Sequence, residues 1–207
     1  NILHTEAAQV GALDVGFVPG EGGLSTAQML EPGALDVAFL LGVDEIDVPD
    51  GAFVIYQGTH GDKGAHRADV ILPGAAYTEK DATWVNTEGR AQYGRRAVFP
   101  PGEAREDWAI VRALSGALGS ALPFDTLAAL QEKMYAAVPH LADIDAVAPG
   151  GQLPENLSAG EMSDQAFVTP IADFYLTDPI ARASKVMAEC SLQIAELAEK
   201  GATGTDG

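Results

Sequence analysis

Three short apolar runs, each bounded by turn-forming residues, constrain the fold of this sequence most strongly. They cover residues 37–41, 53–56 and 70–72. A Pro-Asp-Gly turn precedes the second run, and a Pro-Gly pair ends the third. Short, continuously apolar runs are typical of strands covered on both faces, and such strands, joined by helices and glycine loops, form parallel layers. The sequence therefore predicts an α/β fold with a short parallel sheet and flanking helices.

Helical spacing of apolar residues, together with capping and breaking residues, predicts several helices around this sheet. They are expected at residues 3–13, at 26–30 after the N-cap Ser25, from Glu103 to Gly119, and from the N-cap Asp125 to Pro139. In the third of these, apolar residues recur at positions 110, 111, 114 and 118. This spacing indicates an amphipathic helix packed on the sheet.

Residues 83–93 have the pattern of a β-hairpin. Two short strand-like segments, 83–85 and 91–93, flank the polar tetrad 86–89, which ends in Gly89. Glycine adopts a positive φ without steric cost, so it suits a tight reversal.

The sequence divides into three regions. Residues 1–138 contain the predicted α/β layer, whereas residues 139–170 are rich in Pro, Gly, Ser, Asn and acids and predict an extended connector. Residues 171–207 hold a C-terminal helix and tail. Asp178 is its expected N-cap with Pro179 at the first position, and apolar residues three and four apart continue to Leu197. Such a narrow stripe favours a brace across this protein or a neighbouring one.

Charge and cysteine content exclude several classes of function. The formal net charge of -18 opposes binding to nucleic-acid phosphates or anionic lipid. Cys190 is the single cysteine, so an internal disulfide is impossible and no cysteine-ligated iron-sulfur cluster or zinc site is expected. No apolar run approaches the length needed to cross a bilayer, so direct membrane insertion is not expected. The abrupt start at Asn1 suggests a fragment of a longer polypeptide.

The loop after the second predicted strand is the main candidate for a ligand site. It contains Gly58, Thr59, His60, Gly61 and Asp62. Ligands of α/β folds bind at the carboxyl ends of strands, and glycines let backbone N–H groups approach phosphate. The loop matches neither GxGxxG nor GxxxxGK[ST]. A structured loop is therefore favoured over a phosphate or pterin cradle.

Other chemistry finds little support in the sequence. His60, Asp62 and His66 are close enough to suggest a metal site, but they are few, and solvent-exposed or backbone-bonded loop histidines are favoured instead. The serines lack a nucleophile elbow, and Cys190 lies on the apolar stripe of the last helix. No catalytic residue and no metal ligand is predicted.

Residues 56–92 resemble the C-terminal region of the large iron-sulfur subunit (75 kDa type) of respiratory complex I, NADH:quinone oxidoreductase. The segment reads YQGTHGDKGAHRADVILPGAAYTEKDATWVNTEGRAQ. Its ADVILP and NTEGRAQ blocks are more loosely similar to the molybdopterin oxidoreductases. Residues 100–115, 122–127 and 173–184 also look like this subunit, so the resemblance covers nearly the whole chain.

The resemblance implies a molybdopterin oxidoreductase-like fold in a protein that supports electron transfer from NADH to quinone. It implies 2Fe-2S and 4Fe-4S clusters in the N-terminal part of the parent subunit, and no cofactor bound by this segment. The implied partners are the N-terminal remainder of the same subunit and other peripheral-arm subunits of complex I. The implied location is the cytoplasmic face of a bacterial inner membrane, or the matrix side of the mitochondrial inner membrane. Two alternatives stay open: a fragment of an active, formate dehydrogenase-like molybdopterin oxidoreductase, and a free-standing acidic interaction module.

We expect several residues of the matching block to have structural, non-catalytic roles. Asp69 and Pro73 bracket the third strand, and Gly89 reverses the hairpin. We expect a polar network that ties the hairpin to adjoining loops, with a bidentate contact from Arg90 to a carboxylate as its strongest element. Its expected members are Asn86, Glu88, Arg90 and Gln92.

Overall fold

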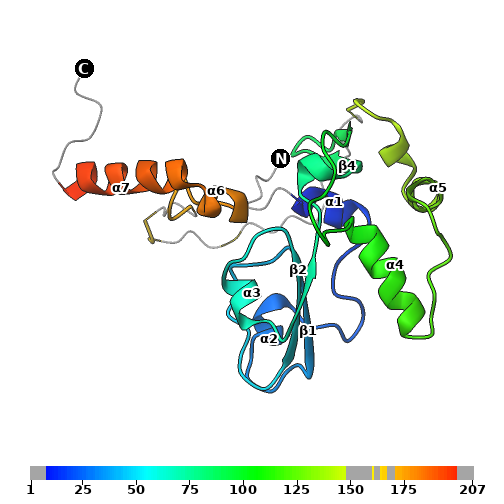
Figure 1. Ribbon diagram of the computed structural model, residues 1–207, viewed down its shortest axis with the longest axis horizontal. Coiled ribbons are helices and arrows are strands. Elements are labelled where there is room, and N and C mark those ends of the chain that lie inside the picture. The colour runs from blue at the N-terminus through cyan, green and yellow to red at the C-terminus, as the bar shows by residue number, and fades with distance from the viewer. Residues whose placement is uncertain (1–7, 148–159, 161–163, 167–170, 200–207) are drawn as a thin grey trace.

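A computed structural model describes residues 8–147, 160, 164–166 and 171–199 of the chain (Figure 1). The α-helices of this part are α1 (Gln9–Asp14), α2 (Thr26–Met29), α3 (Lys63–Arg67), α4 (Asp107–Ala117), α5 (Leu127–Ala137), α6 (Pro179–Ala183) and α7 (Lys185–Glu199). The strands are β1 (Val37–Leu41), β2 (Phe53–Gly58), β3 (Val70–Pro73), β4 (Ala82–Val85) and β5 (Ala91–Gly94). Two 3-10 helices, η1 (Tyr77–Glu79) and η2 (Pro139–Ala142), lie between them.

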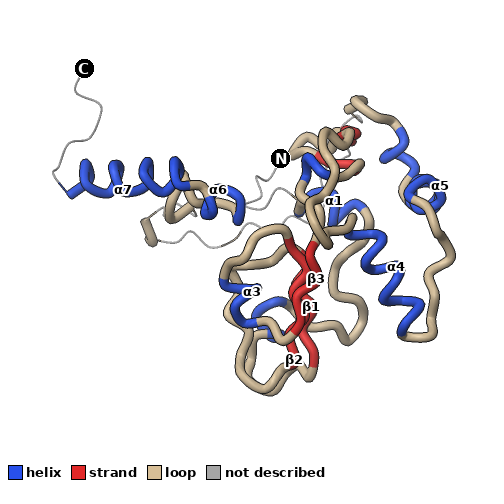
Figure 2. The backbone as a smooth tube through the Cα atoms, viewed as in Figure 1, coloured by secondary structure: helices blue, strands red, loops and turns tan. Residues whose placement is uncertain are grey.

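The three apolar runs form one parallel sheet, as the sequence predicts. Its strand order is β1-β2-β3, and both neighbouring pairs are parallel. Figure 2 shows the three strands in red, close together. Phe39 lies beside Ile55, and Ile55 lies beside Val70. All three carboxyl ends therefore meet at one edge of the sheet, where the loop after β2 also lies.

The main core lies on one face of this sheet, which we call the covered face. Ala38, Leu40, Val54 and Tyr56 alternate along β1 and β2 and are at most 7% exposed. Ala65 of α3 packs against them, together with apolar residues of the loop that joins β1 to β2. The connections after β1 and after β2 therefore cover the same face.

The predicted hairpin is confirmed and has a smaller core of its own. β4 and β5 are antiparallel, with Val85 opposite Ala91. Both side chains pack with Leu141, which is 2% exposed and belongs to η2. Gly89 has a φ of 81°, as its place in the reversal requires.

Two helices begin later than the sequence predicts, because the expected starting residues have other partners. Before α4, the backbone N–H of Arg105 donates to Pro73 O, and Arg105 O accepts from Ala75 N. Residues just before Asp107 thus extend the end of β3. Before α5, the carboxylate of Asp125 binds Arg112 at 2.7 Å, and the neighbouring Thr126 caps the helix instead.

The predicted single C-terminal helix is wrong in one respect, because the structure divides it into α6 and α7. Ser184 has an extended backbone, with φ -84° and ψ 121°. Its carbonyl accepts from Ala188 N and its hydroxyl accepts from Met187 N, so it acts as the N-cap of α7. Asp178 caps α6 as expected, accepting from the N–H groups of Ile180 and Ala181. Figure 1 shows α7 extending away from the sheet and the hairpin.

Other parts of the prediction are confirmed or extended. Ser25 caps α2 in a capping box with Gln28. The first helix is found at Gln9–Asp14, and residues 3–7 of the predicted segment lie outside the described residues. Most of the predicted connector, residues 148–159, 161–163 and 167–170, also lies outside them. The short helix α3 was not predicted and follows directly from the loop that holds the candidate site.

Candidate functional site

The candidate loop follows β2 at the carboxyl edge of the sheet. Gly58, its first residue, ends β2 and lies beside Pro73 at the end of β3. Asp62, its last residue, accepts from Lys63 N at 2.9 Å and so caps α3. The strand end and the helix start therefore fix the two ends of the loop.

The side chain of Tyr56 fills the space inside this loop. Tyr56 is 2% exposed and points to the same face of β2 as position 58, two residues later. A Cβ atom added at Gly58 would overlap the Tyr56 hydroxyl. A Cβ atom added at Gly64 would come within 2.7 Å of Val43 O and 3.0 Å of the Tyr56 ring. The two glycines thus make room for the tyrosine ring.

The Tyr56 hydroxyl joins the loop to a buried carboxyl group. Its oxygen lies 2.9 Å from the backbone carbonyl of His60 and 3.2 Å from Oδ2 of Asp44. The hydroxyl has one proton, and the His60 carbonyl and the Asp44 carboxyl are both placed to accept it. Burial raises the pKa of the Asp44 carboxyl, which is 1% exposed, and this favours the neutral acid. Burial and the adjacent Asp44 also raise the pKa of the Tyr56 hydroxyl.

Arg182 of α6 holds the same loop from the C-terminal segment. Its Nε donates to the Asp62 carboxylate, and a terminal guanidinium nitrogen lies 2.8 Å from Glu45. The other terminal nitrogen donates to Leu176 O at 3.3 Å. The hydrogen bond from Arg182 holds the pKa of the Asp62 carboxyl below its usual value. One guanidinium therefore joins the C-terminal segment to two loops at the carboxyl edge of the sheet.

A cavity of about 300 Å³ lies beside the loop. Its lining residues are Thr59, His60, Pro73, Gly74, Ala76, Glu79, Pro101, Glu103 and Ala104. Glu79 Oε2 accepts from Ala76 N at 2.9 Å, and the Thr59 hydroxyl contacts Nδ1 of His60 at 2.9 Å. None of these described lining residues is a lysine or an arginine. The cavity thus carries carboxylates where a phosphate-bearing cofactor would need positive charge.

The three residues considered for a metal site have separate surroundings. The carboxylate of Asp62 faces Arg182, the His60 ring faces Thr59, and His66 is exposed on α3. Within the described residues, no group of three or more His, Cys, Asp or Glu side chains is placed to hold a metal ion.

A second polar cluster, which the sequence did not predict, connects the sheet to α4. Gln57 is 0% exposed and donates from Nε2 to Oδ1 of Asp107 at 2.9 Å. The other oxygen of Asp107 accepts from Lys80. Gln57 and Lys80 are 50 and 27 positions away from Asp107 in the sequence, so spacing gives no signal for the contact.

Asp69 and Pro73 lie at the two ends of β3, as the sequence predicts. Asp69 pairs with Val54 twice: its backbone N–H donates to Val54 O at 2.8 Å, and its Oδ2 accepts from Val54 N at 2.7 Å. Pro73 O accepts from Arg105 N, which joins the end of β3 to the segment before α4.

The hairpin residues form a network that differs from the expected one. Asn86 Oδ1 accepts from the backbone N–H groups of Glu88 and Arg90, each at 3.0 Å. The Arg90 guanidinium makes one bond to Glu88 at 3.1 Å and one to Asp145 O at 2.9 Å, instead of a bidentate carboxylate contact. Gln92 is exposed on β5 opposite Trp84, apart from these bonds. Arg90 therefore joins the hairpin to the segment after η2.

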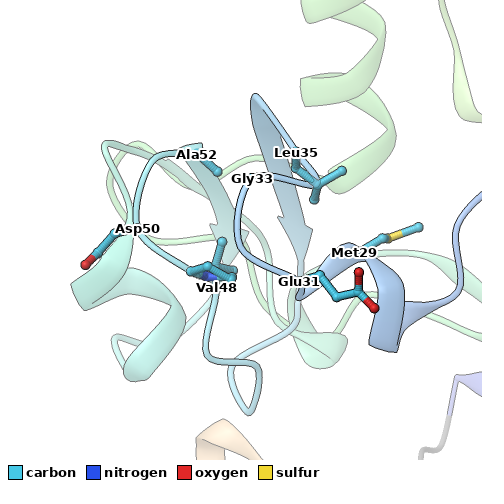
Figure 3. Close-up of a pocket in the computed structure, with 8 residues that line it drawn as sticks. Met29, Glu31, Gly33, Leu35, Val48, Asp50 and Ala52 are labelled. Atoms are coloured by element: carbon cyan, nitrogen blue, oxygen red, sulfur yellow. The ribbon is translucent and has the colours of Figure 1, made fainter.

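A separate crevice near the amino end of the sheet is too small for a ligand. Met29, Gly33, Leu35, Val48 and Ala52 are among its lining residues (Figure 3). Its volume is about 10 Å³, which is no more than one water molecule needs.

Comparison with known proteins gives two family matches. The family described as molybdopterin oxidoreductase matches residues 1–117. A second family, described as the C-terminal region of an NADH-ubiquinone oxidoreductase subunit, matches residues 146–190. The first match contains the whole parallel sheet, the hairpin and α4.

Curated relatives match nearly the whole chain. The mitochondrial NADH-ubiquinone oxidoreductase 78 kDa subunit of Candida albicans is 44% identical over 202 residues, which cover 92% of this chain and 27% of the relative. The mitochondrial NADH dehydrogenase [ubiquinone] iron-sulfur protein 1 of Solanum tuberosum is 42% identical over 201 residues, covering 92% and 26%. The 78 kDa subunit of Neurospora crassa is 43% identical, with the same coverage. The chain thus spans 26–27% of the length of these relatives.

Proposed function

Since this chain belongs to the molybdopterin oxidoreductase family, and within it to the large subunits of NADH-ubiquinone oxidoreductase (complex I), we propose that it is a structural, non-catalytic segment of that subunit. In this proposal, electrons pass from NADH to quinone through iron-sulfur clusters held outside this segment. The resemblance of the sequence implies 2Fe-2S and 4Fe-4S clusters in the N-terminal part of the parent subunit. The segment stabilises the subunit and holds its neighbours.

The observation that carries this proposal is the filling of the loop after β2 by Tyr56. Strand ends of this kind are where α/β folds bind ligands, and glycines there normally let a ligand approach the backbone. Here Gly58 and Gly64 make room for the Tyr56 ring instead. The protein's own side chain thus takes the space that the glycines leave.

The family name implies a molybdopterin cofactor, and the residues at the carboxyl edge do not fit one. The adjacent cavity presents Glu79 and Glu103, which would repel the phosphate of a pterin cofactor. Arg182, a cation at this edge, is bound to Asp62 and Glu45. We therefore derive no chemical step through a pterin or a molybdenum ion.

The proposed partners follow from family membership. They are the remainder of the same polypeptide and other peripheral-arm subunits of complex I, at the matrix side of the mitochondrial inner membrane or the cytoplasmic face of a bacterial one. No described helix is long and apolar enough to cross a bilayer. The net charge of -18 argues against nucleic acid as a partner.

Elemental analysis tests the proposal directly. Complex I that contains this chain is purified, molybdenum and tungsten are measured per flavin, and oxidised pterin is sought by fluorescence after acid extraction. The expected result is neither metal nor pterin in stoichiometric amount. One molybdenum or tungsten ion and one pterin per complex would show that the family's cofactor is retained.

A side-chain variant at the cavity separates the structural role from a catalytic one. His60→Ala removes the ring that lines the cavity but keeps the backbone carbonyl that Tyr56 binds. In this proposal the ring takes no part in the chemistry, so we expect NADH–quinone activity per assembled complex to stay within about twofold of the wild type. A tenfold loss would correspond to about 1.4 kcal/mol of lost transition-state stabilisation. A tenfold loss at normal assembly would contradict the structural role.

A further inference from the structure

The second face of the parallel sheet is apolar, with Ile55 and Leu72 half-buried and its other apolar side chains exposed, and we call it the open face. Its side chains come from alternate positions of all three strands: Val37, Phe39, Leu41, Phe53, Ile55, Val70 and Leu72. Val37 is 55% exposed, Leu41 49% and Phe53 47%. On the covered face, by contrast, Val54 of the same sheet is 0% exposed.

Within the part of the chain that the structure describes, this face is mostly exposed, which is an unusual arrangement for a parallel sheet. Parallel sheets occur almost only with both faces covered, and their strands are apolar throughout for that reason. Contiguous apolar surface of this kind marks an interaction site. The composition of the strands therefore indicates that the open face is buried in the assembled protein.

The connections within the sheet cannot cover the open face. The strand order β1-β2-β3 advances in one direction, and crossover connections between parallel strands have one hand. Two successive crossovers in the same direction consequently lie on the same side of the sheet. The buried cluster agrees with this, because Val48 from the first connection and Ala65 from the second both pack on the covered face.

The described part of the chain reaches the open face at its carboxyl end. There Gln57 is 0% exposed and donates to Asp107 in the first turn of α4. In Figure 1, the later turns of α4 run apart from the strands. Phe39 and Phe53, further back along β1 and β2, remain 38% and 47% exposed.

We propose that the open face binds a part of the same longer polypeptide that lies outside this chain. This inference rests on the proposed function, in which the chain is a segment of the large subunit. The relatives share 92% of this chain, but it accounts for only 26–27% of their length. A second copy is a poor occupant, because two chains of net charge -18 repel each other.

The chemistry of the open face defines what the occupant presents. The seven side chains are aliphatic or phenyl groups without a charge, spread over three adjacent strands. A helix with an apolar stripe at i, i+3, i+4 and i+7 is the element that covers such a surface in α/β folds. The occupant is therefore an amphipathic helix, or two of them, from the remainder of the subunit.

Thiol labelling tests this interface. Cys190→Ser removes the natural cysteine of this chain, and single cysteines are introduced at Val37 and Val70, at opposite edges of the open face. The rate at which a maleimide labels each introduced thiol is compared between this 207-residue chain and the full-length subunit. Mass spectrometry of the peptide that carries the thiol measures this rate. Ser120→Cys, at an exposed polar position, is the control for reagent access. Val54→Cys, on the covered face, reports that the sheet is folded in each sample.

We expect both open-face thiols to react at least about tenfold more slowly in the full-length subunit, and tenfold protection corresponds to about 1.4 kcal/mol. The thiol at position 120 should react at the same rate in both samples. Equal rates of the open-face thiols in the two samples would overturn the proposal. So would protection that rises with the concentration of the 207-residue chain, which indicates a second copy. Protection that appears only after other subunits bind would also overturn it. None of these results depends on whether the subunit contains a pterin, so this inference and the structural role can fail separately.

Discussion

The hydroxyl of Tyr56 lies 2.9 Å from the backbone carbonyl of His60, four residues later in the chain. This contact holds the candidate loop against the carboxyl end of β2, the strand that precedes it. Asp44 contacts the same hydroxyl from the loop after β1, so one phenol group holds two loops at the carboxyl edge.

Tyr56→Phe should destabilise the protein although it keeps the aromatic ring. The change leaves the buried Asp44 carboxyl and the His60 carbonyl without their partner, which costs about 1–3 kcal/mol. Urea unfolding measures the difference. Tyr77→Phe, at a side chain that is 61% exposed, is the matched control and should change the free energy of unfolding little. Equal effects of the two substitutions would contradict the role given to Tyr56.

Asp44→Asn should make the protein more stable at neutral pH. The folded-state pKa of Asp44 is raised above 3.8, so the folded protein keeps a proton that the unfolded chain has already lost. Stability therefore falls as pH rises from 3.8 through the folded-state pKa, and the Asn variant is free of this loss. The amide oxygen of the variant can still accept from the Tyr56 hydroxyl. We expect the free energy of unfolding of the variant to exceed that of the wild type by an amount that grows as pH rises from 3.8 to the folded-state pKa of Asp44. Urea unfolding at a series of pH values measures this, and a difference that does not change with pH would contradict it.

Asp62 gives the opposite pH dependence of stability. Its folded-state pKa lies below 3.8 because Arg182 binds the carboxylate. The stabilisation is thus complete above pH 3.8 and is lost as pH falls through the lower, folded-state value.

Arg182→Lys should release the C-terminal segment from the sheet. An ammonium group cannot reproduce the simultaneous contacts of the guanidinium with Asp62, Glu45 and Leu176 O. For a group that is 23% exposed, we expect a loss of about 1–2 kcal/mol, between the values for surface and buried pairs. Hydrogen exchange of α6 should then be about tenfold faster, since tenfold corresponds to 1.4 kcal/mol.

A control for this substitution lies in the same segment. Lys185→Ala removes one positive charge from an exposed side chain at the start of α7. It should leave the exchange rate of α6 unchanged. If both variants accelerate exchange equally, net charge and not the geometry of Arg182 holds the segment.

Arg90→Ala should lower the amount of assembled complex without changing the potential of any cluster. The variant loses the bonds to Glu88 and to Asp145 O, at a cost of about 1 kcal/mol. Native gels measure assembly, and redox titration of the cluster EPR signals measures the potentials. Arg95→Ala, which removes a cation from the ring of Tyr93 in the same hairpin, is the comparison. Normal assembly with a shifted potential would refute the structural role of Arg90.

The sheet and hairpin could be predicted from sequence because their signals are local. Each strand of the sheet is a short apolar run between turn residues, and the hairpin contains Gly89 at the one position where its φ of 81° is required. Helix starts were harder, because the competing partners are distant. Asp125 has the side chain of an N-cap, but it binds Arg112, and this contact is not visible in the sequence.

The break in the C-terminal helix shows how two local signals compete. The apolar spacing continues past Ser184 and predicts one helix, whereas a serine can also cap a new one. Arg182 of α6 binds Asp62 at the sheet edge, and the backbone at Ser184 is extended, so α7 starts as a new helix. A sequence pattern cannot weigh a contact between positions 62 and 182.

The candidate loop was identified from sequence, but not the residues that fill and hold it. Its position after a buried strand placed Gly58–Asp62 at the carboxyl edge. Tyr56 and Arg182 lie in segments that resemble the complex I subunit, but the resemblance gives neither of them a role, and Asp44 belongs to no motif. Their roles come from burial and from contacts across 12 and 120 residues, which need the folded structure.

The packing of Tyr56 against Gly58 and Gly64 restricts how this loop can diverge. A side chain at Gly58 is excluded while the phenol ring is present, whereas a side chain at Gly64 would also meet the backbone carbonyl of Val43. A smaller residue at position 56 would empty the space that Gly58 leaves. Positions 56 and 58 are therefore epistatic: a side chain at position 58 becomes acceptable only after the tyrosine at position 56 is replaced. A lineage that regained a ligand here would have to lose the aromatic residue first.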